Sequence, residues 1–227
     1  MTPAVTRPRA MLLDLDGTLV DTVPLRVASW MAAFEQEGIT ATPEELGPLM
    51  GADGRWVARH IGEGRGLDLD EIAQDRIDRA SGAWFDRHGR GRRATPAARD
   101  LLVALDALGL PWAIATSSRP EQTTASVAAL GLPHAPDIVD ASHVRHAKPA
   151  PDLLLAGARQ LGVEPADVWY VGDARWDMLA AVAAGMVPVA VLTGATGPDA
   201  MREAGAAIVV ATLAELLEVL RDASPAS

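Results

Sequence analysis

Short apolar runs alternate with segments of helical periodicity from residue 95 to residue 220. The runs predict strands at Pro111–Thr116, Asp137–Val139, Val168–Val171, Val187–Leu192 and Ala207–Val210. The segments between and after them predict helices at 97–108, 118–130, 152–161, 175–184 and 213–220. Alternation at this spacing is typical of a parallel sheet covered by helices, so we predict an α/β, doubly wound fold. Ligands of such sheets bind at the carboxyl ends of the strands.

A further strand is expected in the stretch Ala10–Thr22. The apolar run Met11–Leu13 ends at Asp14 and Asp16, and Gly17 follows, where the chain can adopt a conformation that other residues avoid. Strand residues two apart point to the same face, so the two negative charges are crowded. Such repulsion disfavours folding unless a cation or a reaction uses it. Taken alone, the same pattern also fits a surface turn.

Residues 24–88 contain only helix patterns, which predicts an all-helical cap inserted after the first strand. The expected helices span 25–37, 43–50, 55–61 and 69–88, and Thr42–Glu45 has the form of a capping box. We therefore assign residues 1–22 and 91–227 to a Rossmann-like core and residues 23–90 to the cap. The basic segment His88–Arg93 is interpreted as a solvated hinge, with a contact to substrate phosphate as the alternative.

Composition limits the possible partners and location. The chain has 227 residues, 49% of them hydrophobic, which suffices for one core and a small accessory domain. A net charge of −10 disfavours nucleic acid and anionic membranes as partners, and the absence of cysteine excludes disulfides. Without a signal-like N-terminus or an apolar run near about 20 residues, we expect a cytoplasmic protein with a frayed tail from Ser224. The oligomeric state does not follow from the sequence.

Polar residues gather at four expected loops on the ligand-binding edge of the sheet. They are Asp14 and Asp16, Thr116 to Ser118, Lys148, and Asp173 with Asp177. Three converging acidic positions need a cation, and oxygen ligands favour Mg²⁺, which keeps waters for a phosphate substrate. A hydroxyl and a lysine suit phosphate oxygens. One carboxylate can attack a phosphoryl group while a second serves as general acid and base.

The usage of lysine and arginine singles out the loop that contains Lys148. Of the 20 cationic residues, 19 are arginine, and the single lysine is Lys148. The histidines His60, His134, His143 and His146 show no metal-ligand spacing, so we assign them no chemistry.

These residues make the chain resemble the haloacid dehalogenase-like (HAD) hydrolase superfamily, in the branch with a helical cap. Four motifs occur in order between residues 10 and 192: Asp14-x-Asp16-Gly17-Thr18, Thr116 after an apolar strand, Lys148 followed by Pro-x-Pro-Asp, and Gly172-Asp173-x-x-x-Asp177. The second motif is weak by itself, whereas the four together are specific.

The resemblance implies a role for each matched position. Asp14 would be the nucleophile and a metal ligand, and Asp16 the general acid/base that lends its backbone carbonyl to the metal. Asp173 would complete the Mg²⁺ site, and Asp177 would orient the metal surroundings or be a first-turn helix acid. The candidate residues for binding the phosphoryl group are Thr116, Ser117 and Lys148; the two hydroxyls could alternatively be helix caps. In the cap, Arg55 and Arg59 would meet a substrate anion or form a solvated face.

The implied function is a Mg²⁺-dependent phosphatase that hydrolyses a small phosphorylated metabolite through an aspartyl-phosphate, similar to phosphoglycolate phosphatases. The sequence does not fix the metabolite. A sugar-phosphate mutase similar to β-phosphoglucomutase is the alternative, but such mutases have a histidine where this chain has Arg26, which cannot shuttle a proton. Asp16 disfavours a haloacid dehalogenase, whose nucleophile lacks this partner carboxylate. A non-catalytic binding module on the same fold is the third alternative.

Overall fold

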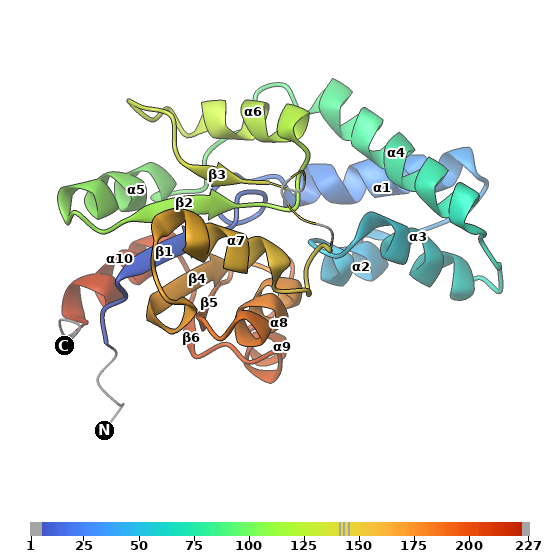
Figure 1. Cartoon of the computed structure of the whole chain (residues 1–227). Helices are drawn as coiled ribbons and strands as arrows, with labels where there is room; N and C mark the ends of the chain where they lie inside the picture. Colours follow the sequence, from blue (N-terminus) through green and yellow to red (C-terminus); the bar gives the residue numbers. More distant parts are fainter. Residues whose placement is uncertain (1–5, 141, 143, 145, 224–227) are drawn as a thin grey trace.

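A six-stranded, wholly parallel sheet forms the centre of the molecule (Figure 1). The computed structural model describes residues 6–140, 142, 144 and 146–223, so the expectations for His143 and for the tail from Ser224 lie outside it. The strand order is β3-β2-β1-β4-β5-β6. The strands are β1 (Ala10–Leu13), β2 (Trp112–Ala115), β3 (Ile138–Val139), β4 (Val168–Gly172), β5 (Val187–Val191) and β6 (Ile208–Val210). The predicted α/β doubly wound fold is confirmed.

Helices cover both faces of this sheet. They are α5 (Ala98–Ala107), α6 (Pro120–Ala129), α7 (Asp152–Leu161), α8 (Arg175–Ala184), α9 (Pro198–Glu203) and α10 (Leu213–Asp222), with a short 3₁₀ turn, η3 (Pro165–Asp167). Helix α9 was not expected, because six residues are too few to show a helical period. No helix in the described part of the chain is long and apolar enough to cross a membrane.

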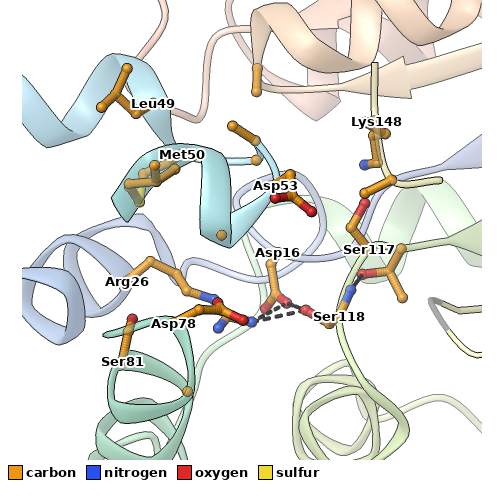
Figure 2. A pocket seen from close by; sticks show the side chains of 18 of the residues that line it. Asp16, Arg26, Leu49, Met50, Asp53, Asp78, Ser81, Ser117, Ser118 and Lys148 are labelled. Carbon is orange, nitrogen blue, oxygen red and sulfur yellow. Dashed lines mark hydrogen bonds and ion pairs between the residues drawn. The ribbon is translucent and has the colours of Figure 1, made fainter. Parts of the chain in front are cut away.

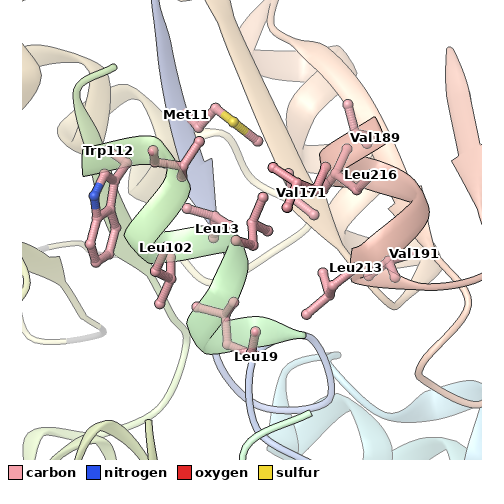
Figure 3. Close-up of a cluster of buried hydrophobic side chains, with 14 of the residues drawn as sticks. Met11, Leu13, Leu19, Leu102, Trp112, Val171, Val189, Val191, Leu213 and Leu216 are labelled. Carbon is pink, nitrogen blue, oxygen red and sulfur yellow. The ribbon is translucent and has the colours of Figure 1, made fainter. Parts of the chain in front are cut away.

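The alternating side chains of β1 connect the two layers of the core. Met11 and Leu13 point to the face where they meet Leu102 of α5 and Leu213 of α10 (Figure 3). Leu12 points to the opposite face, into the apolar cluster that includes α7 and α8. Because both faces are buried, the strand is a continuous apolar run, as expected for a parallel sheet.

The segment between β1 and α5 is helical. It contains α1 (Val23–Gln36), α2 (Pro43–Leu46), η1 (Gly47–Leu49), α3 (Gly54–Glu63) and α4 (Glu71–His88), and we call it the cap. All residues from 23 to 90 are described, and none lies in a strand. The cap has its own apolar cluster, which includes Trp30, Phe34 and Ile77. Its boundaries at residues 22/23 and 90/91 stay a prediction.

The start of the second cap helix is as expected, but its end is not. The Thr42 hydroxyl accepts from the Glu45 N–H at 3.3 Å and the Glu45 carboxylate accepts from the Thr42 N–H at 2.9 Å, which confirms the capping box. The α-helix ends at Leu46 rather than near Met50 and continues as a 3₁₀ turn. Pro48 has no N–H to continue the α-helical ladder.

Candidate active site

The first strand delivers two carboxylates and a tight turn to the carboxyl edge of the sheet. The Asp14 N–H donates to the Val171 carbonyl at 2.9 Å, which continues the pairing of β1 with β4 for one residue. Gly17 follows with φ +94°, and a Cβ there would collide with the Asp173 carboxylate. Glycine is therefore required both by the backbone conformation and by the close approach of Asp173.

The ammonium of Lys148 lies between two carboxylates. Its Nζ donates to Asp14 Oδ1 at 2.6 Å and to Asp177 Oδ1 at 2.7 Å, and the lysine side chain is only 3% exposed. Burial raises the pKa of Asp14 to about 7, although the charge of Lys148 acts in the opposite direction. Burial also opposes the charge of Lys148, but Asp14 and Asp177 outweigh it, so the lysine pKa lies well above its ordinary value.

Asp177 accepts hydrogen bonds from three groups. Besides Lys148, its Oδ1 accepts from the Tyr170 hydroxyl at 3.0 Å, and its Oδ2 accepts from the Ala174 N–H at 2.9 Å. The Ala174 bond is that of an acid in the first turn of α8, as one interpretation of the sequence had it. With these donors in place, Asp177 holds Lys148. Tyr170 was not anticipated, because its position in a buried strand looks like ordinary core.

Three buried carboxylates form a candidate metal centre. Oxygen atoms of Asp14, Asp173 and Asp177 lie within 4.8 Å of one another. The Thr18 hydroxyl donates to Asp173 Oδ1 at 2.8 Å, yet burial and then the charges of Asp177 and Asp14 raise the Asp173 pKa well above its ordinary value. One ammonium does not balance three carboxylates, so this donor set fits a divalent cation held by oxygen.

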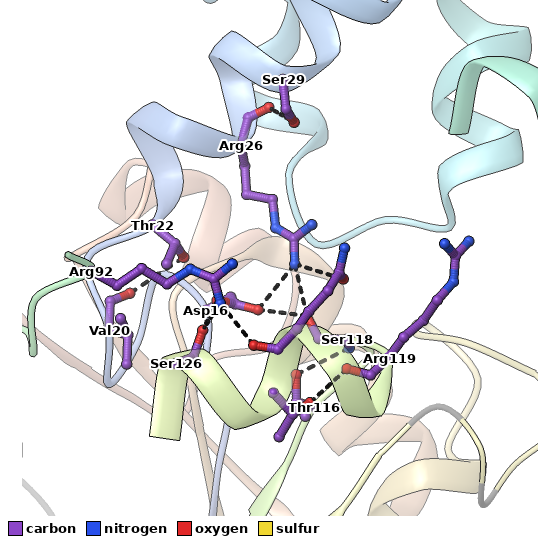
Figure 4. Close-up of polar contacts among 12 residues, drawn as sticks. Asp16, Val20, Thr22, Arg26, Ser29, Arg92, Thr116, Ser118, Arg119 and Ser126 are labelled. Atoms are coloured by element: carbon purple, nitrogen blue, oxygen red, sulfur yellow. Dashed lines mark hydrogen bonds and ion pairs between the residues drawn. The ribbon is translucent and has the colours of Figure 1, made fainter. Parts of the chain in front are cut away.

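The side chain of Asp16 lies outside this cluster. Its Oδ2 accepts from Ser118 Oγ at 2.5 Å and from Arg26 Nη2 at 3.2 Å, and its Oδ1 accepts from Ser126 Oγ at 3.1 Å (Figure 4). Burial opposes the charge, but Arg26 and the two hydroxyls outweigh it and lower the pKa of Asp16. The proposed contact of its backbone carbonyl with a metal stays a prediction.

The loop after β2 supplies three hydroxyls with different roles. Thr116 Oγ1 accepts from the Ser118 N–H at 3.1 Å. Ser117 Oγ is buried and has no hydrogen-bond partner among the described residues. Ser117 lines a cavity between the cap and the core (Figure 2). The helix expected from residue 118 begins instead at Pro120, without a side-chain cap, and the Ser118 hydroxyl donates to Asp16.

A cavity of about 390 Å³ opens between the cap and the core, above these residues. Asp14, Thr116, Ser117 and Lys148 line it from the core, and Leu49, Met50, Asp53, Asp78 and Ser81 line it from the cap (Figure 2). Cap and core also touch through Trp56 and Trp176, whose ring centroids lie 5.1 Å apart. The volume suits a small metabolite.

The comparison with protein families identifies the chain. A family model described as haloacid dehalogenase-like hydrolase matches residues 11–191. This protein belongs to the haloacid dehalogenase-like hydrolases. The resemblance seen in the four motifs is therefore confirmed.

Relatives of this HAD-like hydrolase are phosphatases. Hexitol phosphatase A of Escherichia coli is 34% identical over 85% of this chain and 87% of its own. Phosphoglycolate phosphatase 1 of Pseudomonas aeruginosa is 30% identical over 94% of this chain and 80% of its own. A solved hydrolase from Pseudomonas syringae superposes with a TM-score of 0.89 at 32% identity, over 95% of this chain and 99% of its own. The predicted enzyme class, a HAD-like phosphatase, is confirmed.

The arginines of this HAD-like phosphatase differ in their surroundings. Arg55 lines the cavity. Arg59 is exposed, and its Nε lies 3.8 Å from Glu63 Oε1. The interpretation of residues 88–93 as solvated is wrong for Arg92, whose side chain is 3% exposed. Its guanidinium donates to the Gln122 carbonyl at 2.7 Å, and Arg92 is not among the residues that line the cavity.

Proposed function

We propose that this chain is a Mg²⁺-dependent phosphatase that hydrolyses a small phosphorylated metabolite through an aspartyl-phosphate on Asp14. The observation that carries the proposal is the setting of Asp14 in the wall of the cavity. Its carboxylate is 2.6 Å from the buried ammonium of Lys148 and beside Asp173 and Asp177. A nucleophilic carboxylate needs such positive charge nearby, because the group it attacks is itself an anion.

The reaction has two balanced steps. In the first, an Asp14 oxygen attacks phosphorus, the ester P–O bond breaks, and the leaving oxygen takes a proton from Asp16. In the second, water attacks phosphorus, Asp16 takes a proton from the water, and the bond from phosphorus to Asp14 breaks to release phosphate. The Arg26 ion pair favours ionised Asp16, the form that accepts this proton. The first step uses its minor protonated form.

The remaining site residues bind and orient. Lys148 would neutralise a phosphoryl oxygen next to Asp14, and the Ser117 hydroxyl, which has no partner among the described residues, would donate to another. Thr116 lines the same wall of the cavity. The Asp14 and Asp173 side chains, with the Asp16 carbonyl, would hold Mg²⁺. When bound, the ion would offset the repulsion between these carboxylates and the substrate phosphate.

Two alternatives have less support. A mutase similar to β-phosphoglucomutase would need a proton shuttle at residue 26, and Arg26 is instead a permanent cation paired with Asp16. A non-catalytic module would not need a lysine buried against the nucleophile position. The relatives' names include hexitol phosphatase and phosphoglycolate phosphatase, so polyol and carboxylate-bearing phosphates are the first substrates to test.

A phosphate-release assay tests the proposal. Wild-type protein and Asp14→Asn are compared on a panel of sugar, polyol and carboxylate phosphates, with added Mg²⁺ and with excess EDTA. We expect release only by wild-type protein with Mg²⁺, since the Asn amide is nearly isosteric but a poor nucleophile. Undiminished turnover in EDTA would contradict the metal assignment, and turnover by Asp14→Asn at a tenth of the wild-type rate, about 1.4 kcal/mol of barrier, would contradict the nucleophile.

A further inference from the structure

Both oxygens of Asp16 are held by side chains that come from distant parts of the chain. Arg26, on cap helix α1, donates to Oδ2, as does Ser118 from the loop before α6. Ser126, within α6, donates to Oδ1 at 3.1 Å. Figure 4 shows these groups converging on the carboxylate from opposite sides.

The guanidinium of Arg26 is itself fixed. The same Nη2 donates to Ser118 Oγ at 2.8 Å and to Gln122 Oε1 at 3.2 Å. The guanidinium carbon lies 3.6 Å from the ring centroid of Phe85, a fully buried residue of α4. A planar cation that stacks on an aromatic ring and bonds in its own plane has little freedom to move.

A second arginine completes the arrangement. The chain passes between core and cap twice, before α1 and after α4, and Arg92 lies at the second of these crossings. The guanidinium of Arg92 also lies against Phe85, at 4.2 Å, and its Nη1 donates to Ser126 Oγ at 3.0 Å. Arg26 thus holds Asp16 directly, and Arg92 holds it through Ser126. The two crossings lie side by side, where Val20 bridges Ala94 and the Thr95 N–H donates to the Leu19 carbonyl at 2.9 Å.

We propose that Arg26 is a positioning residue for Asp16: from the cap it orients the carboxylate that exchanges protons with the leaving group and the attacking water. This inference rests on the proposed function, in which Asp16 is the acid and base. Proton transfer needs its groups within hydrogen-bond reach, so a carboxylate free to rotate away would slow both steps.

The leaving group gives a readout that a purely structural role would not move. Release of 4-nitrophenolate needs little proton assistance, whereas release of a benzyl alkoxide depends on it. We would measure kcat/KM, which reports the first step, for 4-nitrophenyl phosphate and benzyl phosphate, and take their ratio. The ratio does not depend on the fraction of enzyme that is folded, so a variant of lowered stability is still informative.

The variants are Arg26→Ala, Asp16→Asn and Arg119→Ala. Arg119 is the matched control, because it also joins the core to the cap but does not contact Asp16. Its Nη2 lies 2.9 Å from Asp78 Oδ2. Removing the Arg26 charge also raises the protonated fraction of Asp16, which favours the first step, but we expect the loss of orientation to outweigh this gain. Arg26→Ala should lose at least ~10-fold more kcat/KM on benzyl phosphate than on 4-nitrophenyl phosphate, in the same direction as Asp16→Asn. Arg119→Ala should leave the ratio unchanged. With 4-nitrophenyl phosphate, Arg26→Ala should also show a burst of nitrophenol, because hydrolysis of the aspartyl-phosphate is slowed.

The possible outcomes distinguish failure of this inference from failure of the proposed function. If Asp16→Asn shifts the ratio and Arg26→Ala does not, the positioning role is wrong while the proposed mechanism stands. If neither variant shifts it, the acid role of Asp16 fails and the inference fails with it, although phosphatase activity and its dependence on Asp14 remain. A shift of equal size in Arg119→Ala would show that any cap-to-core contact matters, which also contradicts a specific role for Arg26.

Discussion

Lys148 and Asp14 form a buried ion pair, with Nζ 2.6 Å from Oδ1 and side chains that are 3% and 8% exposed. They are separated by 134 positions in the sequence. Desolvating two such charges costs free energy that their attraction repays only with good geometry and further hydrogen bonds. Here Asp177 accepts the second Lys148 bond, so the ammonium has two fixed directions.

This geometry predicts that arginine cannot replace Lys148. A guanidinium is planar and wider than an ammonium, so it cannot occupy the same point between two carboxylates. We expect both Lys148→Arg and Lys148→Ala to lose at least ~100-fold in kcat/KM, the scale of removing one preorganised charge contact. Steady-state kinetics on the preferred substrate measure this. Near-wild-type turnover by Lys148→Arg would mean that the lone lysine is an accident of composition.

The surroundings of Asp173 predict a metal-specific effect at Gly194. A Cβ at this position would collide with the Asp173 carboxylate and lie 2.7 Å from its backbone oxygen. We expect Gly194→Ala to need at least ~10-fold more Mg²⁺ for half-maximal activity, as for other residues that orient a metal ligand. The matched control is Gly197→Ala, whose Cβ would meet nothing within 4 Å. An equal Mg²⁺ requirement in the two variants would contradict the metal site.

The raised pKa of Asp14 predicts how stability depends on pH in the absence of metal. Between about pH 4 and 7 the unfolded chain loses this proton while the folded protein, with an Asp14 pKa of about 7, keeps it. The folded state therefore binds more protons, and stability falls as the pH rises through this window. Asp14→Asn lacks this contribution, although Asp173, whose pKa is also raised, still acts in the same direction.

Thermal melting in EDTA across this pH range measures the difference. We expect a shallower fall in Tm for Asp14→Asn than for wild-type protein, and added Mg²⁺ should raise the Tm of wild-type protein most at the high-pH end. Parallel pH profiles for the two proteins would contradict the raised pKa of Asp14.

Local patterns were enough to predict the sheet and to predict that the motif residues lie close together at one of its edges. The apolar run before Asp14 and the alternation after residue 95 gave the strands, because a strand buried on both faces has a continuous apolar signature. Asp14, Lys148 and Asp173 follow strands or precede helices at one edge, and the structure brings them together.

The polar surroundings of Asp16 could not be predicted in the same way. Ser118 fits a local helix-cap pattern, but its hydroxyl bonds instead to a carboxylate 102 positions away. Ser126 is 110 positions from Asp16, and Arg92 lies in a glycine-rich segment that locally favours solvent exposure. Tyr170 lies in a buried strand, and its hydroxyl donates to Asp177 because α8 begins beside that strand. Such contacts depend on tertiary packing, which the local periodicity of the sequence does not reveal.

The central claim is that Asp14 becomes phosphorylated during turnover, and chemical trapping tests it most directly. Borohydride reduces an acyl phosphate on an aspartate to homoserine, a change that peptide mass spectrometry assigns to a single residue. Wild-type protein would be quenched during turnover of 4-nitrophenyl phosphate with Mg²⁺, reduced and digested. We predict homoserine at position 14, absent when substrate is omitted and absent in Asp14→Asn. Turnover with an unmodified Asp14 peptide, or trapping at another carboxylate, would contradict the account.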